Sequence, residues 1–338
     1  MGESWLITGG AGFIGSNFLR MALDRTDAQL VVLDALTYAG NIENIADILT
    51  SPRIKFIKGN ICDHALVTSI FSDYGIEKVI HFAAESHVDR SILGPKIFIQ
   101  TNIDGTFTLL EAARAAWKRN EGLFLQIGTD EVFGALEPND RPFNEESPYK
   151  PSSPYSASKA SADHLVRAWH HTFGLPTIVS NCSNNYGPWQ YPEKMIPLMI
   201  LNALEGKELP VYGDGLQVRD WIHVEDHCDA LLTVLEKGKP GETYAIGGNC
   251  EKANIDVVRA ICDAVDSQLK RPKQTSRGLI RYVNDRPGHD RRYAVDNFKA
   301  RAELGWWPMR DFEMSLADLV QWYVERKAWA NAIRAKRI

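Results

Sequence analysis

A glycine-rich segment near the N-terminus constrains the fold of this 338-residue chain more than any other feature. Residues 9–15 read Gly-Gly-Ala-Gly-Phe-Ile-Gly, and they stand between an apolar run at 5–7 and a helical pattern at 13–23. Glycine lets the backbone turn tightly and approach an anion closely, and the helix N-terminus then offers free N–H groups. The segment therefore predicts a strand–loop–helix unit that binds the pyrophosphate of a dinucleotide.

The pattern that follows the glycine loop predicts a parallel sheet. Continuous apolar runs alternate with helical stretches, and they lie at 30–33, 54–57, 79–82, 123–127 and 177–180. Such strands are buried on both faces, so helices must cover the two sides of the sheet. We expect an α/β fold with a doubly wound parallel sheet of the Rossmann type.

A change of rhythm after about residue 188 predicts a second, smaller lobe. The segments there are shorter and richer in proline, glycine and tryptophan. We expect residues 1–188 to form the dinucleotide-binding domain, and 189–338 to form mainly a mixed α/β substrate lobe. The apolar patterns at about 220–248 predict that the chain returns there to the first domain.

Composition argues against several classes of function. The net charge is −5, whereas a nucleic-acid-binding surface needs a basic stripe. No apolar run approaches the roughly 20 residues that span a bilayer, and the N-terminus lacks the pattern of a secretory signal. The five cysteines form no C-x-x-C pair, and the histidines show no metal-ligand spacing. We expect a cytoplasmic protein that binds no metal, nucleic acid or membrane.

An aspartate at the end of the second strand predicts the identity of the dinucleotide. Asp34 follows Gly15 by 19 residues, where a carboxylate accepts hydrogen bonds from the adenosine ribose. Because the same charge repels a 2′-phosphate, the residue favours NAD over NADP. The ends of the third and fourth strands complete the predicted cofactor pocket with Asn60, Ile61, Ala83 and Ala84.

A Tyr-x-x-x-Lys pattern supplies a candidate base. Tyr155 and Lys159 are four residues apart, so they share one face of a helix that Ser153 and Pro154 are suited to begin. A nearby ammonium stabilises a phenolate, and we expect it to hold the pKa of Tyr155 below its ordinary value of about 10.

Two adjacent carboxylates follow the strand at 123–127. Thr129 can hydrogen-bond a reacting hydroxyl, and Asp130 and Glu131 form an acid pair at the edge where a doubly wound sheet binds its ligands. Hydride transfer alone needs only a tyrosine, a lysine and a hydroxyl. The two further carboxylates therefore indicate a second proton-transfer task, as in an elimination.

Taken together, these residues resemble the dTDP-glucose 4,6-dehydratases, a family of the extended short-chain dehydrogenase/reductase superfamily. The resemblance spans nearly the whole chain, and it rests on the runs at 8–15, 34–41, 82–92, 129–134, 184–188, 219–221 and 285–290. The Thr-Asp-Glu triplet at 129–131 and the Leu-Thr-Tyr-Ala-Gly-Asn run at 36–41 are its most specific parts.

The resemblance implies a redox-neutral cycle on a nucleotide-diphosphate sugar. Tyr155 would take the proton of the 4-hydroxyl while NAD accepts the hydride from carbon 4. Glu131 would then remove the proton of carbon 5, and Asp130 would protonate the departing 6-hydroxyl. Return of the hydride to carbon 6 would give dTDP-4-keto-6-deoxyglucose.

The resemblance also implies the binding residues and the assembly. The cofactor residues would be Gly9, Gly12, Phe13, Ile14, Gly15, Asp34, Leu36, Thr37, Asn60, Ile61, Ala83, Ala84, Tyr155, Lys159 and Asn185. The substrate residues would be Ser86, Thr129, Asn184, Lys194, Met195, Pro210, Tyr212, Arg219, Asn254, Arg286, His289 and Tyr293. Two helices per subunit, at Lys96 to Trp117 and Pro154 to Phe173, would form the four-helix interface of a homodimer.

Two departures from the family pattern and three alternatives stay open at this point. Gly128 stands where the family usually has serine, and Asn60 stands where it usually has aspartate. A uridine or cytidine diphosphate carrier would keep the chemistry, because the nucleobase pocket cannot be read from the sequence. A nucleotide-sugar 4-epimerase would share the glycine loop, Tyr155 and Lys159, but it has no need of Asp130 and Glu131. A non-catalytic sensor would need none of this set.

Overall fold

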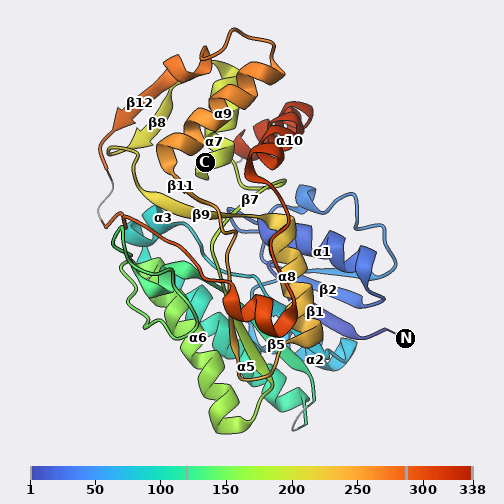
Figure 1. The fold of residues 1–338 in the computed structure, drawn as a ribbon. Coiled ribbons are helices and arrows are strands. Elements are labelled where there is room, and N and C mark those ends of the chain that lie inside the picture. Colours follow the sequence, from blue (N-terminus) through green and yellow to red (C-terminus); the bar gives the residue numbers. More distant parts are fainter. Residues whose placement is uncertain (1, 119–120, 286–287, 336–338) are drawn as a thin grey trace.

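The computed structural model describes residues 2–118, 121–285 and 288–335, and it has a large α/β domain and a smaller lobe (Figure 1). Seven parallel strands form the sheet of the large domain in the order β10-β6-β5-β4-β1-β2-β3. Their bounds are β1 (Ser4–Thr8), β2 (Gln29–Asp34), β3 (Ile54–Lys58), β4 (Lys78–His81), β5 (Leu123–Thr129), β6 (Thr177–Cys182) and β10 (Thr243–Ile246). The predicted doubly wound sheet is confirmed.

Helices cover both faces of this sheet, as the apolar strands require. One face packs against α1 (Phe13–Arg25) and α8 (Val224–Lys237), and the other packs against α2 (His64–Tyr74), α5 (Gly105–Ala116) and α6 (Pro154–Phe173). Successive residues of β1 point to opposite faces, so Ile7 joins the core under α1 and Leu6 joins the core under α2 and α5.

Local sequence signals explain where α6 begins and ends. The Ser153 side chain accepts a hydrogen bond from the Ser156 N–H at 3.1 Å, and Pro154 occupies the first turn. Gly174 ends the helix in the left-handed conformation with φ of 69°. The predicted cap and first helical residue are confirmed, and they fix the helix that carries Tyr155 and Lys159.

The helix predicted at 96–117 is built from three consecutive parts. These are α4 (Pro95–Phe98), a π-helical segment at Ile99–Asp104, and α5. The shorter α3 (Val88–Leu93) precedes them, and 3₁₀ turns lie at Ile42–Asn44 and Asp130–Phe133. Strand β5 continues two residues beyond the predicted run, because Gly128 and Thr129 pair with β6. Thr129 is therefore the last residue of a strand.

The smaller lobe has its own core and two small sheets. A parallel pair joins β8 (Leu209–Tyr212) to β12 (Ile280–Val283), and a three-stranded sheet joins β7 (Asn184–Tyr186), β9 (Val218–His223) and β11 (Glu251–Ala253). Its helices are α7 (Met195–Glu205), α9 (Asn254–Gln268), α10 (Phe312–Glu325) and α11 (Lys327–Ala335), with a 3₁₀ turn at Ser276–Leu279.

The chain passes between the two parts more than once. Helix α8 and strand β10 belong to the large domain, although lobe segments precede and follow them (Figure 1). A later segment containing the π-helical turn Ala300–Leu304 also packs into the large core, where Ala300, Leu304 and Trp306 are buried. Nothing in the sequence pattern signals this second return.

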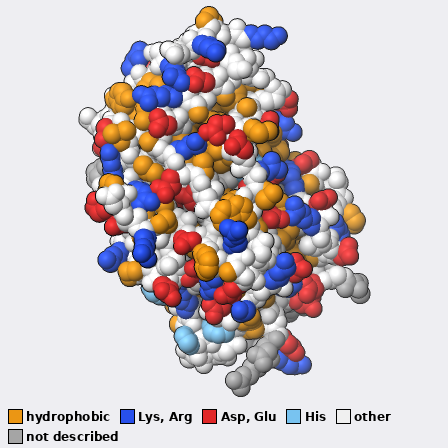
Figure 2. Space-filling view, viewed as in Figure 1, with side chains coloured by type: hydrophobic (Ala, Val, Ile, Leu, Met, Phe, Trp, Pro, Cys, Tyr) orange, Lys and Arg blue, Asp and Glu red, His pale blue; other side chains and the backbone are white. Residues whose placement is uncertain are grey.

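Charged side chains of both signs are interspersed over the face shown in Figure 2. All five cysteines are free thiols. Within the described residues, no helix has the length and apolarity needed to cross a membrane, and no group of three or more His, Cys, Asp or Glu side chains could hold a metal ion.

Candidate active site

A cavity of about 340 Å³ opens at the carboxyl end of the seven-stranded sheet, where parallel α/β sheets bind their ligands. The glycine loop, Asp34, the end of β5 and the start of α6 all line it. The cavity brings together all predicted catalytic residues and every predicted cofactor residue except Leu36. Leu36 instead packs against the core under α1, while its N–H helps to hold Asp34.

The loop that would hold a pyrophosphate needs glycine, because side chains there would collide with the backbone. Gly9 has φ of 71°, and a Cβ on it would lie 2.6 Å from the Ala83 nitrogen. A Cβ on Gly15 would lie 2.4 Å from the Gly9 oxygen. No side chain caps the start of α1 at Gly12, so the helix N-terminus faces the cavity with its dipole. These residues fit a bound dinucleotide.

Asp34 is held in place by its own turn. Its Oδ2 accepts the Ala11 N–H at 2.9 Å, and its Oδ1 accepts the Leu36 N–H at 2.8 Å. Burial raises the pKa of Asp34, and these two hydrogen bonds work in the opposite direction. Each oxygen keeps a further lone pair, so the carboxylate can still accept from ribose hydroxyls.

Asn60, the departure beside the adenine position, also lines the cavity. Its amide oxygen accepts the Cys62 N–H at 2.9 Å. The side chain thus has a fixed orientation, and its oxygen can still accept one more hydrogen bond.

The acid pair sits in a short 3₁₀ turn directly after β5. The Thr129 hydroxyl donates to Asp130 Oδ1 and accepts from the Glu131 N–H, both at 3.3 Å. Asp130 is only 2% exposed, and its Oδ2 has no hydrogen-bond partner among the described residues. Burial first, and then the charges of Glu131 and Asp220, raise the pKa of Asp130 well above its ordinary range. Asp130 is thereby suited to be a proton donor.

Tyr155 and Lys159 are buried at the start of α6. Lys159 Nζ donates to the Ile127 carbonyl at 2.7 Å, which ties the helix to β5. The expectation of a lowered pKa for Tyr155 was wrong, since burial and the nearby Glu131 raise it well above its ordinary value. The Thr129 hydroxyl acts in the opposite direction by hydrogen bonding. Burial also lowers the pKa of Lys159.

Part of the predicted substrate set lies at the same cavity. Ser86, Asn184 and Lys194 line it, and Lys194 Nζ donates to the Ser86 carbonyl at 3.0 Å. Asn184 Oδ1 is buried without a hydrogen-bond partner among the described residues. The next residue, Met195, is the first of α7.

The remaining predicted substrate residues belong to the lobe and do not line this cavity. They are Pro210 and Tyr212 in β8, Arg219 in β9, Asn254 at the start of α9, and His289 and Tyr293 after β12. Arg286 lies outside the described residues.

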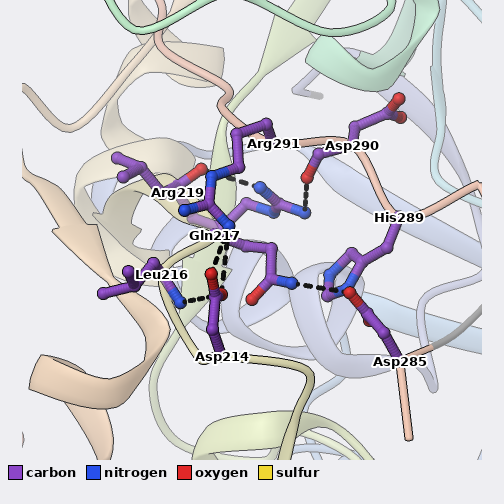
Figure 3. Close-up of polar contacts among 9 residues, drawn as sticks. Asp214, Leu216, Gln217, Arg219, Asp285, His289, Asp290 and Arg291 are labelled. Atoms are coloured by element: carbon purple, nitrogen blue, oxygen red, sulfur yellow. Dashed lines mark hydrogen bonds and ion pairs between the residues drawn. The ribbon is translucent and has the colours of Figure 1, made fainter.

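Polar contacts join the segment after β12 to β9 and the turn before it (Figure 3). Arg219 donates to the Asp290 carbonyl at 2.9 Å, and its guanidinium stacks over the Tyr293 ring at 4.3 Å. Gln217 Nε2 donates to Asp285 at 2.9 Å, and His289 contacts the same carboxylate at 2.6 Å. The cluster therefore places Arg219 and His289 on neighbouring segments.

Several cavity residues were missed by sequence reasoning. Tyr38 and Tyr191 line the cavity with their rings 5.7 Å apart, edge to face, and Arg90 lies 3.9 Å over the Tyr38 ring. Glu193 lines it beside Lys194. Tyr38 falls within the run at 36–41, so its place in that run was the available signal.

Comparisons with known proteins agree with this geometry. The family model described as GDP-mannose 4,6 dehydratase matches residues 6–319. The dTDP-glucose 4,6-dehydratase of Salmonella typhimurium is 55% identical, over 98% of this chain and 95% of the relative. A dTDP-glucose 4,6-dehydratase structure from Streptomyces venezuelae, with NAD bound, has a TM-score of 0.91 at 43% identity, over 98% of this chain and 99% of that chain.

A UDP-glucose 4-epimerase from Thermotoga maritima shares the fold at a TM-score of 0.85 but is only 27% identical, over 96% of this chain and 99% of that chain. The much higher identity to the dehydratases, over nearly the full length, decides between the two classes. The predictions of the fold, of NAD as cofactor and of a dTDP-glucose 4,6-dehydratase are confirmed. The chain belongs to the dTDP-glucose 4,6-dehydratase family.

Proposed function

We propose that this protein converts dTDP-glucose to dTDP-4-keto-6-deoxyglucose, with the proton transfers divided among Tyr155, Glu131 and Asp130. The observation that carries this proposal is the acid pair at the end of β5. Asp130 is enclosed and its pKa is strongly raised, whereas Glu131 is adjacent and only partly buried. Unequal environments for two neighbouring carboxyl groups favour one acid and one base.

Tyr155 takes the proton of the 4-hydroxyl in the first step. The Thr129 hydroxyl interacts with Tyr155 and is placed to hydrogen-bond the same sugar oxygen. The glycine loop and Asp34 would hold NAD, which would supply a hydride acceptor for carbon 4 and a positive charge to offset the carboxylates that raise the pKa of Tyr155. Lys159, one helical turn further along α6, supplies a further positive charge.

The 4-ketone acidifies carbon 5, and Glu131 removes the proton there. Asp130 gives its proton to the departing 6-hydroxyl, which leaves as water. The hydride then returns to carbon 6 and a proton returns to carbon 5, so the cofactor ends each cycle in its starting oxidation state. Burial of Asp130 limits exchange of its proton with bulk solvent, whereas the partly buried Glu131 allows exchange at carbon 5.

The lobe holds the nucleoside diphosphate in this proposal. Lys194 and Arg219 supply positive charge for the diphosphate, and His289 comes from the segment beside Arg219. Arg286, which lies outside the described residues, is a further cation proposed for the diphosphate. Tyr212, Asn254 and Tyr293 complete the nucleoside side. Thymidine is the proposed base because it is the one named for the most similar dehydratases.

Incubation with a panel of nucleotide sugars tests this function. We expect dTDP-glucose to lose one water, with kcat/KM at least about tenfold above the uridine and cytidine analogues. Products are identified by mass spectrometry and NMR. Turnover without a change of mass would indicate epimerisation, and a preference for another nucleotide would correct the carrier.

We also propose that the protein is a cytoplasmic homodimer paired through α5 and α6. Exposed apolar side chains gather on α3 to α6 at Ile92, Leu93, Ile97, Ile99, Phe107 and Phe173. The Trp169 ring contacts both Phe107 and Phe173, so the apolar surface is continuous across the two helices. Two copies related by a two-fold axis would cover it as a four-helix interface. Free thiols suit a reducing compartment.

Light scattering at micromolar concentration measures the assembly. We expect the mass of two chains for the parent protein and the mass of one chain after Phe107→Lys, which places a charge in the apolar surface. A monomeric parent protein would contradict the proposal.

A further inference from the structure

A buried polar network lies behind the catalytic strand end, and the mechanism above does not use it. Its centre is Asp163 on α6, which has no exposed surface. One carboxylate oxygen accepts the Tyr149 hydroxyl at 3.0 Å and the Asn181 amide at 2.9 Å, while the other has no hydrogen-bond partner among the described residues. A buried carboxylate is costly unless it is paired, so this one calls for an explanation.

The network reaches the catalytic residues through the main chain of β5. The Asn181 amide that donates to Asp163 also donates to the Thr129 carbonyl at 3.3 Å. Lys159, one helical turn before Asp163, donates to the Ile127 carbonyl at 2.7 Å. The two carbonyls that flank Gly128 are thus held by one lysine and one asparagine. Asp163 accepts a hydrogen bond from that asparagine and lies one helical turn from that lysine.

Gly128 makes this close approach possible. A Cβ at that position would lie 2.5 Å from the Asn181 amide nitrogen, 2.8 Å from the Ser180 carbonyl oxygen and 3.1 Å from the Asp163 carboxylate. Any side chain there must displace the hydrogen bonds between α6, β5 and β6. The position that departs from serine is therefore one where an added Cβ would collide with the network.

Charge links Asp163 to Lys159. Burial lowers the pKa of Lys159, and the Asp163 carboxylate is the main influence that raises it, followed by Cys182 on β6. His81 on β4 also faces the lysine, but burial and the lysine charge lower its pKa to about 3, so it is neutral. Burial raises the pKa of Asp163 itself, whereas the charges of Lys159 and Arg167 and the hydrogen bonds from Asn181 and Tyr149 act in the opposite direction and favour its ionised form. Asp163 is the carboxylate placed to balance the buried ammonium.

We propose that Asp163 is a positioning residue for the reaction: it fixes Thr129 through Asn181, and it keeps Lys159 charged one helical turn from Tyr155. The inference rests on the proposed function, since it concerns the first oxidation. Without Asp163, the ammonium would lose its proton more readily in its buried site, and Tyr155 would lose the cation that favours its phenolate.

The test follows the first oxidation in single turnovers, read from NADH absorbance with excess holoenzyme and dTDP-glucose. This step does not need Asp130, and its rate constant does not depend on the folded fraction. In Asp163→Asn, we expect this rate to fall about tenfold or more at neutral pH. Lys159 is active when protonated, so its lowered pKa should move the alkaline loss of rate to lower pH by about one unit.

Asp266→Asn is the matched control, because Asp266 is also a buried carboxylate, but among the described residues its side chain accepts hydrogen bonds only from Ser276 in the lobe. We expect it to lower thermal stability without changing the pH profile of the oxidation. If Asp163→Asn behaves in the same way, its role is structural only and the proposal is overturned.

Gly128→Ala tests the positional part independently, also where Asp163→Asn does not fold. The added methyl group should displace the Asn181 amide and slow the oxidation about tenfold, without moving the alkaline limb. An unchanged rate would overturn the role of the network. If the parent protein itself does not turn over dTDP-glucose, the proposed function is overturned instead.

Discussion

The two halves of the active site are built in different ways. In the catalytic half, Thr129, Asp130, Tyr155 and Lys159 are each less than a tenth exposed, and they lie on one strand end and one helix. In the nucleotide half, the contacts among β9, the turn before it and the segment after β12 include ion pairs between half-exposed side chains, such as Asp214 with Arg291 (Figure 3).

This difference separates chemistry from recognition. Burial shifts the pKa values of the catalytic groups and amplifies each charge, so single atoms there control the rate. Exposed ion pairs are screened by water, so the exposed contacts of the nucleotide half control affinity only modestly, whereas its buried Arg219 controls affinity more strongly. We therefore expect large kcat effects in the first half and smaller KM effects in the second.

Tyr155→Phe should have the largest effect. The variant lacks the group that takes the 4-hydroxyl proton, and we expect the first oxidation to slow by about 10³-fold. NADH absorbance in a single turnover measures this step. Tyr244→Phe is the control, because Tyr244 is also a buried tyrosine but lies on β10 and interacts with Lys239 and Glu303. Similar losses in both variants would contradict the assignment of the base.

Arg219→Gln should have an intermediate effect and should act on binding. Loss of a charged donor to the diphosphate should raise KM about tenfold to a hundredfold, while kcat changes by less than about threefold. The Arg219 charge lowers the pKa of Asp130, so its loss leaves Asp130 protonated and able to act as the acid. Steady-state kinetics separates the two constants. A loss confined to kcat would place Arg219 in the chemistry instead.

The pH dependence of turnover should report Asp130. Asp130 acts in its protonated form, so turnover should fall as the pH rises through its raised pKa. Asp220, whose own pKa burial raises to about 6, is one of the charges that raise it. Asp220→Asn should therefore move this alkaline limb to lower pH, by about one unit or less. A shift to higher pH would contradict the electrostatic account of the acid.

Asp214→Asn should have the smallest effect. The carboxylate pairs with Arg291 at 3.0 Å, but both side chains are about half exposed. We expect KM for dTDP-glucose to change by about twofold or less. Kinetics at low and at high salt measures it. A tenfold change would show that the exposed contacts are as sensitive as the buried ones, and the comparison would fail.

Sequence reasoning succeeded where one segment carries the whole signal. The glycine loop between β1 and α1 and the cap at Ser153 depend on residues close together in the chain. The end of β5 could be recognised because an apolar strand leads directly into Thr129. Hydrophobic period and turn chemistry are sufficient for such features.

Other features depend on contacts between distant segments and left no local signal. The network of Tyr149, Asp163 and Asn181 joins a loop, a helix and a strand. The pairing of β8 with β12 and the burial of Trp306 in the large core likewise connect remote parts of the chain. The raised pKa of Tyr155 was missed because burial is its largest cause, and burial is a property of the folded molecule.

The most direct test of the account is the division of labour between Asp130 and Glu131. Rapid-quench mass spectrometry in deuterium oxide, together with NADH absorbance, follows oxidation, carbon 5 exchange and water loss separately. In Asp130→Asn and Glu131→Gln, we expect overall turnover to slow about 10²-fold or more while the first oxidation survives.

The two variants should also differ from each other. Glu131→Gln should lose exchange of the carbon 5 proton, since it lacks the base. Asp130→Asn should keep that exchange and accumulate NADH with the 4-keto sugar before water is lost. If both variants turn over at the rate of the parent protein, the two carboxylates have no catalytic role, and the elimination mechanism is contradicted for this protein.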